Sequence, residues 1–129
     1  MVIDTSVIVA ILFDEPERDH FTRLIDQADT RLVSAVGRLE SVCVVEGRKH
    51  RAGRERLDRF FHLTGAEVVG VTPEQAGIAV EAFRRFGRGR HPARLNIGDC
   101  FAYALAKATG EPLLFKGGDF ARTDIIPAA

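Results

Sequence analysis

Short apolar segments alternate with helical segments along the whole chain, and this alternation constrains the fold more than any other feature. We expect strands at 1–4, 31–33, 67–71, 112–115 and 123–126. Between them, helical apolar spacing and capping residues predict helices that begin near residues 5, 16, 34, 54, 72 and 97. Strands separated by helices pair in parallel through right-handed crossovers. The sequence therefore predicts an α/β fold, with a parallel sheet covered on both faces.

Size and composition favour one globular unit. The 129 residues, 46% hydrophobic and 28% charged, are predicted to form a single domain over 1–129. The longest apolar run, Val7 to Phe13, is far shorter than the ~20 residues that cross a bilayer, and no basic segment precedes it. Cys43 and Cys100 are far apart in sequence, so we interpret them as free thiols in the core of a cytoplasmic protein.

The formal net charge is zero, but acidic and basic residues are concentrated in different parts of the chain. Residues 1–47 contain four Lys/Arg and nine Asp/Glu, whereas residues 48–94 contain eleven Lys/Arg and five Asp/Glu. Residues 95–129 contain three and four. An uneven solvated surface is the simplest explanation, but such separation is also typical of proteins that hold metal cations beside a polyanion.

Four carboxylates occupy positions where ligands bind in parallel sheets, beyond the carboxyl ends of the strands or on adjoining helices. Asp4 and Asp119 follow predicted strands, Asp99 begins a strongly apolar helix, and Glu40 lies beside the apolar stripe of Val36, Leu39 and Cys43. Helix capping, a turn or a solvated helix edge would explain each one alone. Together they predict a site for a hard divalent cation, Mg²⁺ or Mn²⁺, because carboxylates that cluster repel one another.

Ordered motifs give the chain a resemblance to a known family. Val2-Ile3-Asp4-Thr5-Ser6, the helical Glu40, Leu95-Asn96-Ile97-Gly98-Asp99-Cys100 and Leu-Leu-Phe-Lys-Gly-Gly-Asp-Phe, which ends at Phe120, resemble a PIN domain of the VapC toxin type. The likeness covers essentially the whole chain.

The resemblance implies a three-layer α/β/α sandwich and Mg²⁺-dependent endoribonuclease activity, as the toxin of a toxin–antitoxin pair. It implies partners as well: an RNA substrate, a cognate VapB-like antitoxin and a second copy in a homodimer. The catalytic and metal-binding acids it implies are Asp4, Glu40, Asp99 and Asp119, supported by Thr5, Ser6 and Asn96. Relatives often carry Asp or Asn where this chain has Gly118, so Asp124 is the alternative fourth acid, and one or two metal ions remain possible.

An arginine-rich loop precedes the segment that contains Asp99. Between residues 84 and 94 it has five arginines and no acid, and glycines and a proline make it an exposed loop. The predicted RNA-binding residues are Arg84, Arg85, Arg88, Arg90 and Arg94. A solvated basic loop, or one that binds the antitoxin, is the alternative.

Other functions remain as alternatives. A non-catalytic nucleic-acid-binding module would explain the basic half but not Glu40 and Asp99. A phosphatase of the haloacid-dehalogenase type needs a second Asp where this chain has Ser6, and a phosphotransfer receiver domain needs an acidic pair after the first strand, where only Asp4 is present.

Overall fold

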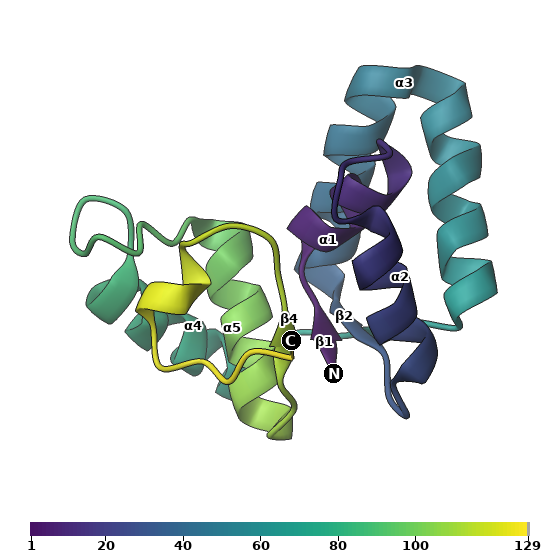
Figure 1. The fold of residues 1–129 in the computed structure, drawn as a ribbon. Helices are drawn as coiled ribbons and strands as arrows, with labels where there is room; N and C mark the ends of the chain where they lie inside the picture. Colours follow the sequence, from purple (N-terminus) through teal and green to yellow (C-terminus); the bar gives the residue numbers. More distant parts are fainter. Residues whose placement is uncertain (129) are drawn as a thin grey trace.

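The structure, a computed structural model, describes residues 1–128 and is built on a four-stranded parallel sheet (Figure 1). The strand order is β3-β2-β1-β4. The strands are β1 (Val2–Ile3), β2 (Leu32–Ser34), β3 (Glu67–Val69) and β4 (Leu113–Leu114). The helices are α1 (Thr5–Leu12), α2 (Arg18–Gln27), α3 (Ala35–Thr64), α4 (Pro73–Phe86) and α5 (Ile97–Thr109), with a short 3₁₀ turn η1 (Phe120–Arg122).

Helices cover both faces of this sheet. Successive residues of a strand face opposite sides, so Val2 packs with the core under α4 and α5, and Ile3 packs with the core under α1, α2 and α3. Leu113 and Leu114 divide between the two cores in the same way. Figure 1 shows the two helical layers on either side of the strands. The predicted α/β sandwich is confirmed.

Local signals determine most helix ends. Ser34 caps α3 by accepting from the N–H of Val36 (3.2 Å), and Thr72 caps α4 by accepting from the N–H of Gln75 (3.1 Å). Gly65 and Gly110 end α3 and α5 in the left-handed conformation, with φ of 62° and 74°. At α1 the cap is Asp4, whose side chain accepts from the N–H of Ser6.

The two helices expected at 34–47 and 54–63 are present as the two arms of α3, which meet where the chain reverses at His50 (φ 49°, ψ −127°). Two expectations were wrong. The strand expected at 67–71 is shorter and forms the sheet edge, with Glu67 and Val68 exposed, because no strand pairs beyond it. Residues 123–126 form no strand; after η1, a bridge between Leu113 and Pro127 joins this part of the chain to the sheet.

Within residues 1–128, no helix is both long and apolar enough to cross a membrane.

Candidate metal centre

Asp4 is the most buried acid of the predicted set. It directly follows β1, and only 5% of the residue is exposed. Its Oδ2 accepts hydrogen bonds from the backbone N–H and the hydroxyl of Ser6, at 3.1 and 2.6 Å. Burial raises the pKa of Asp4 to about 7; the Ser6 hydrogen bonds oppose this shift, and the charges of Asp99 and Glu40 add to it. An ionised carboxylate in this position is stabilised by a cation.

Glu40 reaches from α3 to the first turn of α5. A Cβ added to Gly98 would lie 2.2 Å from Oε2 of Glu40 and 2.7 Å from its Cδ, so the carboxylate packs directly on the Gly98 backbone. Any other residue at position 98 would displace Glu40. Gly98 is therefore a site residue that sequence reasoning missed, although a glycine in a first helical turn costs about 1 kcal/mol relative to alanine and is a signal in itself.

The prediction that Glu40 lies beside a buried apolar stripe with Leu39 and Cys43 was wrong. Leu39 is 64% exposed and Cys43 is exposed as well, so they form no buried stripe, and Cys43 is not a core thiol. The buried residues of this helix arm are Ser41 and Val45. Glu40 adjoins this buried side and is half-buried because it packs on α5.

Asp99 lies in the first turn of α5, where it forms a capping box with Asn96. The N–H of Asp99 donates to Oδ1 of Asn96 (2.8 Å), and the N–H of Asn96 donates to Oδ2 of Asp99 (3.0 Å). Burial raises the pKa of Asp99; the Asn96 N–H opposes the shift, Glu40 and Asp119 add to it, and Arg88 opposes it. These hydrogen bonds hold the Asp99 carboxylate in place, which is a physical reason for the supporting role predicted for Asn96.

Asp119 and Asp124 have different surroundings. Asp119 is exposed at the start of η1, and its charge acts on Asp99. Asp124 accepts from the hydroxyl of Tyr103 (2.6 Å) and lies 3.2 Å from Nζ of Lys107. Burial acts to raise the pKa of Asp124, but these hydrogen bonds outweigh it and lower the pKa. Asp124 is thus engaged in a network with Tyr103 and Lys107, whereas the charge of Asp119 acts on Asp99.

The two predicted supporting hydroxyls also differ. Ser6 contacts Asp4 directly, as described above. Thr5 is buried, and its hydroxyl donates to the carbonyl of Gly37 in α3 at 3.3 Å. Thr5 therefore ties α1 to α3, and Ser6 is the residue that supports Asp4.

The chemistry of this donor set fits a hard cation. All four acids offer oxygen, whereas Cys100 is buried in the core and the thiol of Cys43 is exposed elsewhere on α3. Within residues 1–128, no three carboxylate, imidazole or thiol groups are already close enough to share one ion. Like charges repel, and a bound cation would offset the repulsion among these carboxylates.

The five arginines predicted to lie in one loop are all exposed, but only three of them are in the loop. Arg84 and Arg85 belong to the last turn of α4, where they face the acids Glu81 (4.0 Å) and Asp124 (3.6 Å). Arg88 lies near enough to Asp99 to act on its pKa. Arg90 stacks over Phe83, and Arg94 has a φ of 56°.

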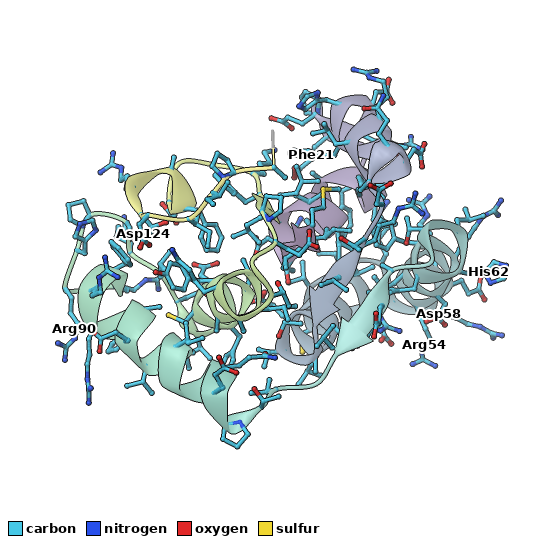
Figure 2. The ribbon with its side chains drawn as sticks, turned by 90° about the horizontal axis from the view of Figure 1, so that it is seen from below. Phe21, Arg54, Asp58, His62, Arg90 and Asp124 are labelled. Atoms are coloured by element: carbon cyan, nitrogen blue, oxygen red, sulfur yellow. The ribbon has the colours of Figure 1, made fainter. Side chains whose placement is uncertain are left out.

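The basic residues fall into two separate regions. Figure 2 shows Arg90 projecting from one side of the molecule, whereas Arg54 of the α3 hairpin lies on the other side. The sequence suggested one basic half, because residues 48–94 include both regions. The fold separates the α3 hairpin from the loop, and only the loop adjoins Asp99.

Comparison with known proteins places this geometry in a family. Residues 1–126 match the PIN domain model. The chain is 46% identical over 129 residues to "Ribonuclease VapC30" of Mycobacterium tuberculosis, covering 100% of this chain and 98% of the relative. It is 44% identical over 130 residues to "Ribonuclease VapC42" of the same species, covering 99% and 98%. The chain belongs to the PIN-domain family.

A solved structure supports the fold independently. The crystal structure of Mycobacterium tuberculosis VapC20, described as a sarcin-ricin loop cleaving toxin, superposes with a TM-score of 0.77. The match covers 97% of this chain and 95% of VapC20, at 19% sequence identity. Within the PIN family, the chain is thus similar over its full length to VapC ribonucleases.

Proposed function

We propose that this protein is a metal-dependent endoribonuclease and the toxin of a toxin–antitoxin pair. The observation that carries the proposal is that four acids from separate segments lie near enough for their charges to act on the pKa values of Asp4 and Asp99. Curated relatives with full-length similarity are named ribonucleases, which supports RNA as the substrate. Mg²⁺ is the proposed ion, with Mn²⁺ as a substitute.

Each residue has a distinct part in this reaction. Asp4, Glu40, Asp99 and Asp119 would hold the ion, Ser6 and Asn96 would fix Asp4 and Asp99, and Gly98 would admit Glu40. A bound divalent cation lowers the pKa of coordinated water and polarises the scissile phosphate. Attack by water in line with the leaving oxygen gives a 3′-hydroxyl and a 5′-phosphate, and no carboxylate needs to act as a covalent nucleophile.

Metal-stripped protein and end-labelled RNA test the activity. We expect no cleavage until Mg²⁺ is added, products with 5′-phosphate ends, and no cleavage by Asp99→Asn under saturating Mg²⁺. Asp29→Asn is the matched control, because Asp29 is exposed between α2 and β2, at the opposite end of the sheet. Full activity of Asp99→Asn would refute the metal assignment. RNA binding without any cleavage would instead support a non-catalytic binding module.

The basic loop is the proposed RNA contact. Its base is fixed just before Asn96, since the N–H of Arg88 donates to the carbonyl of Leu95 (3.0 Å) and the N–H of Leu95 donates to the carbonyl of Phe86 (2.9 Å). This anchor keeps Arg88 beside Asp99. Arginine binds phosphate through its planar fork and reads no base there, so contacts from this loop would be independent of sequence.

A cleft on the other helical layer is the proposed antitoxin site. It has a volume of about 480 Å³ and lies between the end of α1, α2 and the second arm of α3. Ile25, Phe60 and Leu63 line it, with Leu63 69% exposed. Its charged lining is Arg18, Arg56 and Arg59 with the acids Asp14 and Asp26, and Asp14 pairs with Arg18, so basic side chains predominate. An amphipathic antitoxin helix with acidic flanks fits this chemistry, and a basic residue of its tail would compete with metal for the carboxylates.

Co-purification tests the antitoxin assignment. The product of the neighbouring gene should co-purify with the wild-type protein, and Leu63→Glu should abolish this. Val71→Glu is the matched control, because Val71 is 40% exposed and does not line the cleft. Equal retention by both variants would place the antitoxin elsewhere. A protein that is harmless when expressed alone would argue against the toxin role.

A second copy is the proposed occupant of the apolar rim beside the acids. Leu39 and Ile97, 64% and 74% exposed, directly precede Glu40 and Gly98, which contact each other. Burial of this rim in a homodimer would remove both side chains from water. Sedimentation should show that the wild-type protein is a dimer and that Ile97→Lys is a monomer. Ile126→Lys, which changes another exposed side chain (67% exposed), should remain a dimer.

We also propose a cytoplasmic location, where the RNA substrate and free thiols are expected.

A further inference from the structure

Lys116 contacts both Ser6, the hydrogen-bond partner of Asp4, and the turn between α1 and α2. It begins the segment Lys116-Gly117-Gly118-Asp119 that follows β4 and leads to η1. It makes two sets of contacts, one with its backbone and one with its side chain. Neither is required by the proposed reaction itself.

The backbone contact leads directly to Asp4. The N–H of Lys116 donates to Oγ of Ser6 at 3.0 Å, and that hydroxyl donates its own proton to Oδ2 of Asp4 at 2.6 Å. A hydroxyl has one proton to donate, so the Lys116 N–H determines which way Ser6 points. The orientation of the buried carboxylate therefore depends on the position of the Lys116 backbone.

The side-chain contacts lead to the turn between α1 and α2. Nζ of Lys116 lies 2.6 Å from Oε2 of Glu15 and 3.0 Å from Oε2 of Glu17. All three side chains are partly buried, with 33%, 30% and 41% exposed. Two acids therefore hold one ammonium group between them, and the turn and the segment after β4 are joined.

The residues between Lys116 and Asp119 cannot supply this anchoring. Gly117 has a φ of 94°, and a Cβ added to Gly117 or Gly118 would meet nothing within 4 Å, so neither has neighbouring atoms to pack against. At the far end, Phe120 is buried and packs on Phe115, with ring centroids 5.3 Å apart. Lys116 and Phe120 are thus the two fixed points of the segment that carries Asp119.

We propose that Lys116 is a positioning residue of the metal centre, with Glu15 and Glu17 as its anchors. The ion pairs hold the start of the acid-bearing segment, so that Asp4 keeps its hydrogen bond to Ser6 and Asp119 stays beside Asp99. The proposal rests on the acid centre proposed above and adds to it three residues that need not touch the cation or the RNA.

Calorimetric titration of the metal-stripped protein with Mn²⁺ alone tests this role. In Lys116→Met, Mn²⁺ should bind about 10-fold more weakly, the usual effect of removing a group that orients metal ligands. Lys116→Arg, which keeps the charge, should restore most of the affinity. Lys107→Met is the matched control, because Lys107 also pairs with an acid, Asp124, outside the centre. Circular dichroism must show each variant folded at the titration temperature.

Two further readouts separate positioning from general stabilisation. The Mg²⁺ concentration for half-maximal cleavage should rise in Lys116→Met, while the rate at saturating Mg²⁺ changes much less. The double variant Glu15→Gln, Glu17→Gln should weaken Mn²⁺ binding by a similar factor, and combining it with Lys116→Met should add little, since one unit is removed in each case.

Unchanged Mn²⁺ affinity in folded Lys116→Met would overturn the proposal. Fully additive effects in the combined variant would overturn it as well, because the three residues would then act independently. If instead the wild-type protein fails to bind Mn²⁺, or Asp99→Asn binds it equally well, the acid centre itself is refuted.

Discussion

Replacement of Asp4 by asparagine should abolish cleavage and yet stabilise the metal-free protein. Asparagine keeps the size of the side chain and an oxygen that can accept from Ser6, but it cannot ionise. In the wild-type protein the carboxylate is buried, and Asp99 and Glu40 add to the rise of its pKa. The substitution therefore removes an unfavourable buried charge together with a proposed metal ligand.

The pKa of Asp4 determines the size and the pH range of this effect. Folding raises the pKa from 3.8 to about 7. Between these values the folded protein binds a proton that the unfolded chain has released, so stability of the metal-free wild type falls as pH rises through this range. At about 1.4 kcal/mol per pKa unit, the free energy of unfolding of the metal-free wild type falls by about 4 kcal/mol by the time the pH is above 7. Asp4→Asn should gain that amount relative to wild type between pH 4 and pH 8.

Urea denaturation at several pH values, with metal removed by chelation, measures the difference. We expect the two proteins to be similar near pH 4 and the variant to be clearly more stable at pH 8. Saturating Mg²⁺ should reduce the difference at pH 8, because the wild type gains more stability from binding than the variant. Asp29→Asn is again the control. A stability difference that does not change with pH would refute the reasoning.

Three further substitutions test other parts of the structure. Gly98→Ala should raise the Mg²⁺ concentration needed for half-maximal cleavage about 10-fold, because its Cβ would displace a ligand carboxylate; Gly77→Ala, with open space around it, should leave this concentration unchanged. Arg31→Ala should lower the free energy of unfolding by about 2 kcal/mol in urea denaturation, because its guanidinium donates to three carbonyls at the ends of α2 and α3; an unchanged midpoint would contradict this. Replacing Arg88 and Arg90 by alanine should weaken RNA binding on all sequences alike and reduce the salt slope by ~0.7 for each phosphate that the variant no longer binds; an unchanged slope would show that the loop does not touch RNA.

Signals between neighbouring residues allowed most of the fold to be predicted from the sequence. Ser34 and Thr72 cap helices where expected, because a cap depends only on residues two or three positions away. Strand position in the sheet depends on the whole topology. Val68 and its neighbours therefore read as a buried strand although they lie at the edge. The break in α3 at His50 was predictable, because Gly47 and Gly53 flank it.

The acids of the proposed site were chosen from the sequence, but the contacts that position them were only partly predictable. Asp4 and Asp119 follow strands, and strand ends meet at one edge of a parallel sheet. The orientation of Glu40 depends on its contact with Gly98, 58 positions along the sequence, which helical periodicity cannot reveal. Lys116 was missed for a similar reason, because its partner Glu15 lies 101 positions away.

Anomalous diffraction from crystals soaked in Mn²⁺ tests the central claim most directly. If the four acids form one metal centre, an anomalous peak should lie among the carboxylates of Asp4, Glu40, Asp99 and Asp119, and Asp99→Asn crystals should show a weaker peak or none. Asp124 should remain bonded to Tyr103 and contribute no ligand. A peak at another place, or no peak in wild-type crystals at millimolar Mn²⁺, would contradict the account.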